Sequence, residues 1–322
     1  MGYGYFRYRY LTSLGLGYLN KIYNKVFVHH KRKLIRLKPH RHKLLSAEEG
    51  NAIIKERILS GEPFVAARIG GCEMTVVNGI LAERAHIGTL TKKRKRQLVT
   101  NAGFFPYQDD MFSKFADTNI ELSKYCDVYA MFNWINSGYL YDEYVYPNGG
   151  VPALSDCVQP YFFDDPWSSA LKGKTVLVIH PFTETIASQY AKNREKLFEN
   201  KNVLPEFELK TMKAVQTIAG TKDERFETWF DALDFMTNEA LKIDFDVAII
   251  GCGAYGYPLA VRLKAAGKQA VHMGGATQLL FGVKGKRWET EPISKEFNEY
   301  WVRPGEDEKV KTQEKVENAC YW

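Results

Sequence analysis

Three glycines with the spacing G-x-G-x-x-G, namely Gly251, Gly253 and Gly256, follow a short apolar run and precede a segment of helical periodicity. A backbone without Cβ atoms can approach a diphosphate at a helix N-terminus, where amide groups point at the anion. The next predicted strand ends near His272 and has no acid after it to hold the ribose hydroxyls of NAD. The spacing therefore predicts a site for another phosphate-bearing ligand. The alternative is that these glycines serve only a tight turn and close helix packing.

A second glycine turn, RIGGCEM at residues 68–74, follows an earlier predicted strand. Arg68 offers a cation for phosphate, and Glu73 offers a carboxylate for proton transfer or for a metal ion. Gly70 and Gly71 form the turn between them. Because the carboxyl ends of parallel strands share one edge of a sheet, we expect both side chains to face the same crevice as the first glycine turn. The alternative is that Arg68 and Glu73 pair with each other.

His180 follows a third predicted strand, and a helix begins beside it at Thr183. We expect Thr183 to cap this helix, which the pattern extends to Phe198. An imidazole at the carboxyl end of a strand, next to a helix N-terminus, could contact phosphate or accept a proton. The alternative is a histidine whose ring nitrogens have their hydrogen-bond partners within the core.

Short apolar runs and segments of helical periodicity alternate along most of the chain. Strands are predicted at 63–69, 127–132, 175–179, 205–211, 247–250 and 269–273, and helices at 47–59, 91–100, 111–125, 183–198, 228–243 and 254–266, with another helix starting near residue 73. The alternation predicts an α/β fold, with a Rossmann-like, mainly parallel sheet and helices on both of its faces. Residues 136–167 are rich in Tyr, Pro, Gly and Asp, and we expect a loop-rich lid, a sugar-contacting segment or a linker there.

The five cysteines of the 322-residue chain are scattered and include no C-x-x-C pair, which indicates a reducing compartment and argues against a zinc site. No apolar run reaches the ~18 residues of a membrane span, and the first residues show no secretory signal. We therefore expect a cytoplasmic protein with a soluble body. Residues 291–322 are polar and mixed in charge, and we expect a C-terminal tail there, loosely held over about its last ten residues, after a domain at 47–290.

Residues 1–46 form an N-terminal arm with Arg, Lys and aromatic side chains throughout and neither Asp nor Glu, so the excess charge behind the net +6 belongs to this arm. Aromatic rings interleaved with cations suit the headgroup layer of an anionic membrane. We therefore expect a peripheral contact with the inner face of a membrane. A disordered basic tail and a nucleic-acid contact are the alternatives. No nucleic-acid-binding motif accompanies the arm, so we expect no nucleic-acid partner.

With these motifs in place, residues 63–288 resemble the GT-D-fold glycosyltransferases. The segment RIGGCE at 68–73 is similar to the family's R-[FI]-G-D-G-E segment, and VAIIGCGAYGYPLA with GKQAVHMGG is similar to its late strand, glycine turn, helix and strand. The resemblance implies a nucleotide-sugar donor bound on a Rossmann-like sheet. The donor contacts that we expect are Gly70, Gly71, Gly251, Gly253, Tyr255, Gly256, His272, Gly274, Gly275, Gln278 and Lys284.

One position departs from the family's pattern. Gly71 stands where the family has the Asp of an Asp-x-Glu pair that holds a divalent metal on the donor diphosphate. Glu73 matches the other member of the pair, but one carboxylate with diphosphate oxygens is a thin ligand set for Mg²⁺ or Mn²⁺. The diphosphate could be neutralised instead by Arg68, by the helix N-terminus after Gly253, or by Lys284 and Arg287.

The resemblance implies a hexosyltransferase that moves a sugar from a nucleoside diphosphate donor, with a UDP-sugar favoured. The acceptor would be a glycan or a lipid-linked glycan, in the biosynthesis of a surface polysaccharide such as a capsule, or of another glycoconjugate. Arg68 and the amides of the turn at 251–256 would stabilise the departing diphosphate. Glu73 would be the base or a metal ligand, with His180 as the alternative base. A non-catalytic protein that binds nucleotide or glycan and an NAD-dependent oxidoreductase are the alternative classes.

Overall fold

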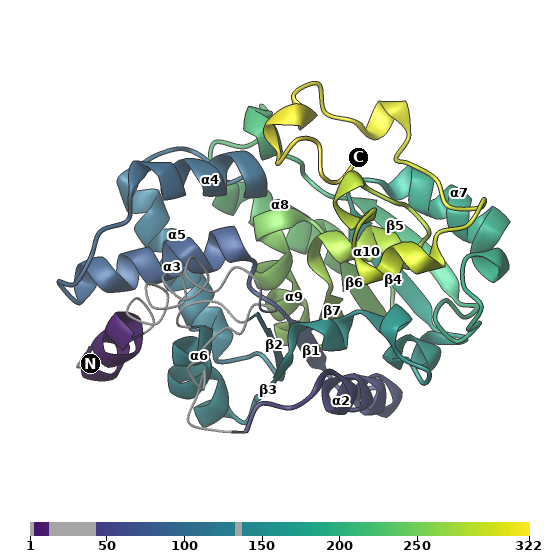
Figure 1. Cartoon of the computed structure of the whole chain (residues 1–322), viewed down its shortest axis with the longest axis horizontal. Coiled ribbons are helices and arrows are strands. Elements are labelled where there is room, and N and C mark those ends of the chain that lie inside the picture. The colour runs from purple at the N-terminus through teal and green to yellow at the C-terminus, as the bar shows by residue number, and fades with distance from the viewer. Residues whose placement is uncertain (1–2, 13–42, 133–136) are drawn as a thin grey trace, which may run out of the picture.

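The computed structural model describes residues 3–12, 43–132 and 137–322, and its centre is one parallel sheet (Figure 1). The strands are β1 (Phe64–Ala67), β2 (Val128–Met131), β3 (Val151–Leu154), β4 (Thr175–His180), β5 (Glu208–Lys213), β6 (Val247–Ile250) and β7 (Gln269–His272). They lie in the order β3-β2-β1-β7-β6-β4-β5, and every pairing in this sheet is parallel. The predicted Rossmann-like α/β fold is confirmed.

Strand β7 occupies the centre of the sheet. It pairs with β1 on one side, where Ala66 lies opposite Val271, and with β6 on the other, where Ile250 lies opposite His272. All four residues of β1, β2, β6 and β7 are buried, as expected for continuous apolar runs covered on both faces. Because the strands are parallel, the residues that follow them gather at one edge.

Helices cover both faces of the sheet, as predicted. They are α2 (Ala47–Ser60), α3 (Gly71–Arg84), α4 (Lys92–Ala102), α5 (Asp109–Ser123), α6 (Ser137–Leu140), α7 (Thr183–Asn193), α8 (Trp229–Leu241), α9 (Gly256–Ala265) and α10 (Thr277–Leu280). One hydrophobic cluster joins α3, α5, α8 and α9 to the sheet, and a second cluster joins α2, α7 and α10 to it. Alternate strand residues contribute to the two clusters: Val65 belongs to the first and Ala66 to the second.

Strand β3 was missed at the sequence level, because it lies within the segment predicted to be loop-rich. It is four residues long, contains Pro152 and forms an edge of the sheet, which is where a proline is tolerated in a strand. Leu45 extends this edge: its amide donates to the Pro152 carbonyl at 3.0 Å, and its carbonyl accepts from Leu154 at 3.1 Å. The lack of an alternating pattern in so short a strand explains the miss.

The start and the end of α7 also differ from the prediction. Thr183 is the first residue of the helix and makes no capping hydrogen bond, and the helix ends at Asn193 instead of Phe198. The carboxylate of Glu308 caps it instead, accepting from the amides of Glu184 at 2.8 Å and Thr185 at 3.2 Å. A capping residue that lies about 120 residues further along the chain cannot be predicted from the residues around the start of the helix.

The last ten or so residues of the chain are not loosely held, so that prediction is wrong: Val316 and Trp322 are buried. Earlier in residues 291–322, Trp301 is buried, and Glu308 is buried at the N-terminus of α7. In Figure 1 this yellow segment lies beside α10 and α7. Its backbone is mostly short 3-10 turns, so it has no helical or strand period that the sequence could reveal. The segment belongs to the body of the domain.

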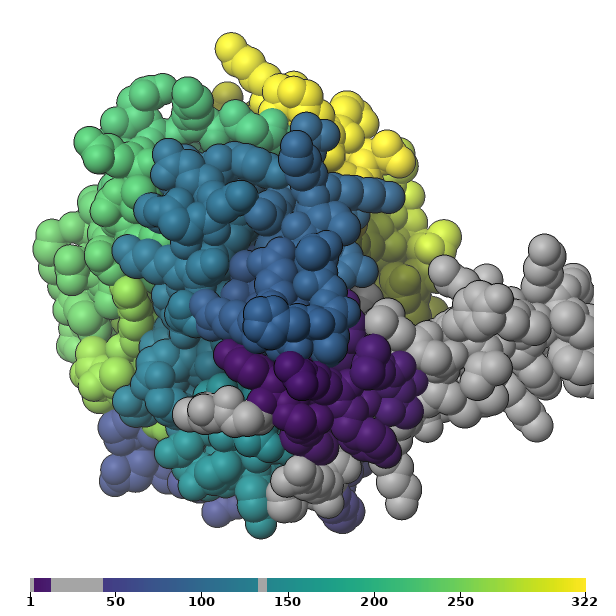
Figure 2. All heavy atoms as spheres, turned by 90° about the vertical axis from the view of Figure 1, so that its left-hand side faces the viewer, coloured from purple at the N-terminus to yellow at the C-terminus, as the bar shows by residue number. Residues whose placement is uncertain are grey.

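Part of the N-terminal arm also belongs to the body. Residues 4–12 are helical, and Phe6 and Tyr10 are buried in the first hydrophobic cluster. The Arg7 side chain donates to the Ala85 carbonyl at 2.9 Å, just after α3. Figure 2 shows this helix (purple) against the blue face of the domain. Residues 13–42, which carry most of the predicted membrane contact, lie outside the described residues. None of the described helices is both long and apolar enough to cross a membrane.

Candidate functional site

The carboxyl edge of the sheet carries two hollows that share Gly275, which follows the central strand β7. The first, here called the Gln278 cavity, encloses about 70 Å³ and is lined by residues that end or follow β4, β5, β6 and β7. The second, here called the Asp156 pocket, has a volume of about 320 Å³ and is lined by residues that follow β1, β2, β3 and β7. The site is thus divided at the middle of the sheet.

The predicted site residues divide between these two hollows. The Gln278 cavity is lined by His180, Gly251, Gly253, Tyr255, Gly275 and Gln278, and the Asp156 pocket by Arg68 and Gly275. Gly70, Gly71, Glu73, Gly256, His272, Gly274 and Lys284 line neither of the two. About half of the predicted residues therefore line a hollow at this edge of the sheet.

His180 is buried at the end of β4, and its ring is held by the next turn. The amide of Phe182 donates to His180 Nδ1 at 3.0 Å, so the ring proton must lie on Nε2. Burial lowers the pKa of His180 to about 3, and the ring is neutral at physiological pH. A neutral imidazole that is protonated at Nε2 can donate to a ligand in the Gln278 cavity but cannot accept a proton there. This geometry favours a donor role over the predicted base role.

Tyr255 forms part of the wall of the Gln278 cavity. Its ring stacks on Trp229 at 5.0 Å, and its hydroxyl lies 2.9 Å from Thr217 Oγ1. Thr217 donates its own proton to the Gly103 carbonyl at 2.6 Å, so Tyr255 must be the donor in the shared bond. Burial raises the pKa of Tyr255. We infer that Tyr255 shapes the cavity and does not act as a base.

Two glutamines that line the Gln278 cavity carry polar atoms without a partner among the described residues. Gln278 is buried, and its Nε2 donates to the carbonyls of Val283 at 3.1 Å and Tyr321 at 3.0 Å, which leaves Oε1 unsatisfied. Nε2 of Gln216 is also buried and unsatisfied. Native structures rarely leave such atoms unpaired, so each is a reason to expect a ligand or water in the cavity. One atom is an acceptor, and the other is a donor.

Glycine is required at the three positions of the G-x-G-x-x-G turn for different physical reasons. A Cβ on Gly251 would lie 2.6 Å from the Gly274 carbonyl oxygen, and a Cβ on Gly256 would overlap with the ring of His272. These two glycines allow close packing of β6 and α9 against β7 and the turn after it. Gly253 has a φ of +59°, a conformation that favours glycine, and it lines the cavity. The predicted alternative, packing and a tight turn, accounts for Gly251 and Gly256.

His272 ends β7 and is buried beneath α9. Neither ring nitrogen has a hydrogen-bond partner within the described part of the chain. Burial, and to a lesser degree the nearby guanidinium of Arg68, lowers the pKa of His272 to about 3. The ring fills the space that Gly256 leaves open, so we assign His272 a packing role and not the predicted ligand contact.

Arg68 follows β1 and reaches over the end of β7. Its Nη2 donates to the Met273 carbonyl, and its guanidinium carbon lies 5.1 Å from the centre of the Phe132 ring. A Cβ on Gly274 would lie 3.0 Å from Nη2, so this glycine makes room for the guanidinium. Burial lowers the pKa of Arg68, but an arginine stays protonated at physiological pH. Arg68 is therefore a fixed cation in the Asp156 pocket, beside Met273 and Gly274.

Glu73 lies in the first turn of α3, and its carboxylate folds back over Gly70, where a Cβ would overlap with it. Burial raises the pKa of Glu73, while its own backbone amide and Arg68 act in the opposite direction. Among the described residues, no three His, Cys, Asp or Glu side chains gather to hold a metal ion. The residues present at Gly71 and Glu73 do not fit Mg²⁺ or Mn²⁺, and we derive no step through a metal.

Several residues of the site could not be singled out in the sequence. Lys284, which was predicted, lines neither hollow, and its amide donates to the Val302 carbonyl at 2.8 Å. The Gln278 cavity is also lined by Asn101, Gln216, Thr217, Tyr321 and Trp322, and the Asp156 pocket by Phe132, Asp156, Gln159, Phe162 and Trp288. The only signal for them was position after a predicted strand, which Gln216 and Thr217 share. Arg287, which was expected as a possible cation for the diphosphate, also lines the Asp156 pocket.

Two solved structures of domain of unknown function 1792 are similar to this chain. A selenomethionine-substituted structure of that domain has a TM-score of 0.47 and 13% sequence identity, and the match covers 84% of this chain and 94% of that chain. A second structure, described as having a distinct glycosyltransferase fold, has a TM-score of 0.45 and 14% identity, with the same coverage of the two chains. No protein-family model matches the chain. No curated protein sequence matches it either.

Proposed function

We propose that this chain is a glycosyltransferase that moves a sugar from a nucleoside diphosphate donor to a carbohydrate acceptor. The observation that carries the proposal is the division of one sheet edge into two hollows that share Gly275, with a fixed cation, Arg68, in one of them beside Gly274. A transferase must hold two substrates side by side and stabilise the charge that develops on the leaving group between them. Gly275, shared by both hollows, marks the position where the two substrates would react.

The Gln278 cavity supplies the contacts for the nucleoside end of the donor. His180 Nε2 and Gln216 Nε2 are donors, and Gln278 Oε1 is an acceptor, which matches the mixed edge of a nucleobase or a ribose. The diphosphate would lie toward Gly275, where Arg68 offsets its charge. Leaving-group stabilisation by Arg68 is the main catalytic task that we assign to this half of the site.

We extend the proposal to a UDP-sugar donor and to a lipid-linked acceptor at the inner face of a membrane. The support is the arm at residues 1–46, which is basic and has no acidic side chain. Phe6 and Tyr10 are buried, so the membrane contact would fall on Tyr8, Leu11 and the residues after them. Tyr8 and Leu11 are exposed on the helix at residues 4–12.

The first test is ligand-induced thermal stabilisation of the full chain by UDP, GDP, CMP, ADP and NAD, each with Mn²⁺ or with EDTA. A ligand at ~100 times its dissociation constant adds about 2.7 kcal/mol to the free energy of unfolding, which shifts the melting temperature measurably. We expect stabilisation by one nucleoside diphosphate, and survival of the shift in EDTA because Glu73 lacks partner carboxylates. Stabilisation by NAD alone, or by none of the five, would refute the donor site.

Arg68→Gln tests the role of Arg68 in transfer, and Lys242→Gln is its control, because the Lys242 side chain is 68% exposed and lines neither hollow. Arg68→Gln is expected to lower the rate of transfer by roughly 10²- to 10³-fold, the usual effect of removing one group that stabilises developing charge. Lys242→Gln is expected to stay close to the wild-type rate. Equal losses in both variants would contradict the role of Arg68.

A second candidate function is favoured by the geometry of Glu73. Its carboxylate is turned toward Gly70, and Gly71 offers no side chain, so a metal-dependent ancestor could have become a protein that binds nucleotide or glycan without catalysis. Slow hydrolysis of the donor separates the two functions, since transferases usually leak donor to water and a binding protein does not. Release of nucleoside diphosphate from a stabilising sugar nucleotide supports the enzyme.

A further inference from the structure

The Asp156 pocket combines aromatic rings with charged and amide side chains. Phe162 is 43% exposed, although it is a large hydrophobic residue, and its ring packs edge-on against Tyr161 at 4.8 Å. Phe132 and Trp288 also line the pocket. An aromatic face left open beside a hollow of about 320 Å³ offers a stacking surface to a small ring-shaped ligand.

The carboxylate of Asp156 is oriented by a short chain of hydrogen bonds. Tyr161 donates to Gln159 Oε1 at 2.7 Å, and Gln159 Nε2 in turn donates to Asp156 Oδ1 at 3.0 Å. Ser155 Oγ adds a longer contact of 3.4 Å to the same oxygen. Within the described residues, the other oxygen, Oδ2, receives none of these bonds. A carboxylate fixed through one oxygen, with the second one available, is the arrangement that a general base requires.

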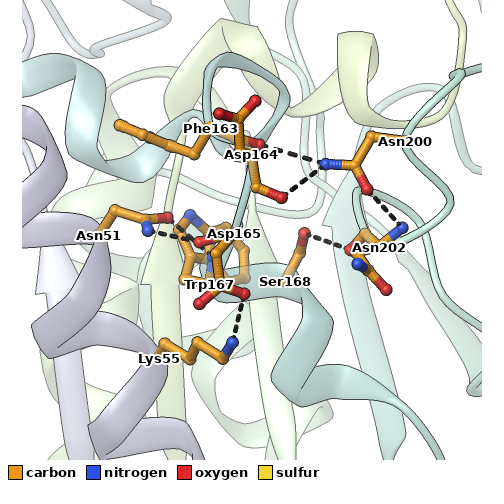
Figure 3. A network of polar contacts seen from close by, with 9 residues as sticks. All are labelled: Asn51, Lys55, Phe163, Asp164, Asp165, Trp167, Ser168, Asn200 and Asn202. Carbon is orange, nitrogen blue, oxygen red and sulfur yellow. Dashed lines mark hydrogen bonds and ion pairs between the residues drawn. The ribbon is translucent and has the colours of Figure 1, made fainter.

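The chain after Phe162 is held on both sides, so the pocket wall is rigid. Figure 3 shows this segment between α2 and the turn at Asn200. Asn51 of α2 donates to the Asp165 carbonyl at 2.9 Å and accepts from the Trp167 amide at 2.8 Å. On the opposite side, Asn200 donates to the Asp164 carbonyl at 2.9 Å. These anchors fix the backbone next to Phe162 before any ligand arrives.

The chain before Asp156 is held equally closely. Strand β3 pairs with β2 along four residues, and α2 packs against β3 and Cys157 through Gly50. A Cβ on Gly50 would lie 2.6 Å from the Cβ of Ala153 and 2.7 Å from that of Cys157. Both the stacking surface and the carboxylate are therefore part of a preorganised structure, which is what a binding site needs to avoid the entropic cost of ordering.

The charges around the pocket favour a neutral ligand with hydroxyl groups. Asp156 and Glu291 are acidic, and Arg68 and Arg287 are basic, so the pocket offers acceptors and donors in similar number. Arg287 already pairs with Glu317 and stacks on Tyr321, which reduces the positive charge available to an anion. A pyranose ring presents one face of C–H groups to an aromatic ring and its hydroxyls to carboxylates, amides and guanidinium groups.

We propose that the Asp156 pocket binds the acceptor as a neutral hexopyranose ring, stacked on Phe162, with Asp156 as the catalytic base; this rests on the proposed function. The proton of the acceptor hydroxyl passes to Asp156 Oδ2, and the hydroxyl oxygen bonds to the anomeric carbon of the donor sugar. The bond from that carbon to the diphosphate breaks, and its electron pair stays on the leaving nucleoside diphosphate, beside Arg68. The products are a glycoside, the nucleoside diphosphate and a protonated Asp156.

Binding is tested on the full chain by saturation-transfer NMR with the methyl β-glycosides of glucose, galactose, mannose and N-acetylglucosamine. We expect at least one glycoside to bind through its C–H face, and Phe162→Ala to weaken that binding about tenfold or more. Tyr125→Ala is the matched control, because Tyr125 is 51% exposed and precedes β2 at the opposite edge of the sheet. Absence of binding by all four glycosides, or equal binding by Phe162→Ala and wild type, would overturn the assignment of this pocket.

The base is tested with Asp156→Asn, with Asp244→Asn as the control because its side chain is 99% exposed and precedes β6 at the opposite edge. Asp156→Asn is expected to lower transfer by roughly 10²- to 10⁴-fold, while the thermal shift with UDP and the binding of the glycoside are kept. Wild-type transfer by Asp156→Asn would overturn its role as the base.

The two proposals fail in different ways. If no nucleotide stabilises the wild-type chain, the donor site is refuted, and glycoside binding that depends on Phe162 would still support the Asp156 pocket as a carbohydrate site. If a nucleotide stabilises the chain but no glycoside binds, the donor site stands and the acceptor assignment is overturned.

Discussion

Replacing Glu308 with Gln should destabilise the chain more than a typical surface substitution. The buried carboxylate of Glu308 caps α7 through the amides of Glu184 and Thr185, and it also accepts from the Thr185 hydroxyl. Glutamine keeps one acceptor oxygen, but its NH₂ group would face a backbone N–H, so one charge-assisted hydrogen bond is lost. That loss costs about 1.5–3 kcal/mol. The lost interaction with the helix dipole adds about 0.5–1 kcal/mol.

The expected total is about 2–4 kcal/mol, which corresponds to a fall in melting temperature of roughly 3–6 °C for a chain of 322 residues. The assay is urea denaturation followed by circular dichroism, with a thermal scan in parallel. Glu306→Gln is the control, because Glu306 lies in the same turn and its side chain is 87% exposed in a pair with Lys309. The reasoning is refuted if Glu308→Gln is no less stable than Glu306→Gln.

Three further predictions concern buried groups and the arm. Burial lowers the pKa of His180 to about 3 from its ordinary 6.5. Between these two pH values the unfolded chain binds a proton that the folded chain does not, so the free energy of unfolding is at its full value above pH 6.5 and falls as the pH falls toward 3. His180→Asn, which keeps an acceptor for the Phe182 amide, should reduce the slope of unfolding free energy between pH 6 and 4 by about 1.4 kcal/mol per pH unit; an unchanged slope would contradict the burial. Gly256→Ala should cost about 1–3 kcal/mol in urea denaturation because its Cβ overlaps with His272, and the cost should shrink in a His272→Ala background. Gln in place of the three cations at residues 31–33 should weaken cosedimentation with phosphatidylserine vesicles about 100-fold, whereas Gln at the exposed α4 residues 92, 93 and 96 should not.

The elements of the sheet centre could be predicted from the sequence because their pattern is local. The run Val247–Ile250 is apolar and bounded by Asp246 and Gly251, and the strand has these same limits in the structure. The helix at Ala47 begins where Ser46 and Glu49 form a capping box, which is a signal of four adjacent residues. Fully buried parallel strands and capped helices therefore follow from residues that are neighbours in the chain.

The contents of the site could be predicted only in part, because they depend on distant residues. The glycine turn at 251–256 was recognised. Glycine is needed at position 256, however, because the ring of His272, on the next strand, leaves no room for a Cβ atom. Asp156 follows β3, an edge strand with a proline that gave no pattern. Its role depends on Gln159 and Tyr161, whose hydrogen bonds no spacing rule anticipates.

The packing of residues 303–322 explains why the Gln278 cavity is small. Trp322 lies against Phe182 with ring centres 5.9 Å apart, and its carbonyl accepts from Arg303 at 2.7 Å. Pockets for small molecules usually have about 300 Å³ or more, whereas this cavity encloses about 70 Å³. The proposed donor can therefore enter only if Tyr321 and Trp322 move away.

The same segment carries both Glu308, which caps α7, and Trp322, which lines the cavity. If residues 303–322 cover the donor site, Glu308→Gln should lower the stability of the free chain and at the same time tighten UDP binding, because less free energy opposes the movement of Trp322. If these residues instead form a fixed wall of the site, both stability and UDP affinity should fall. Titration of UDP into Glu308→Gln and Glu306→Gln, measured by calorimetry, separates the two arrangements by the sign of the change in affinity.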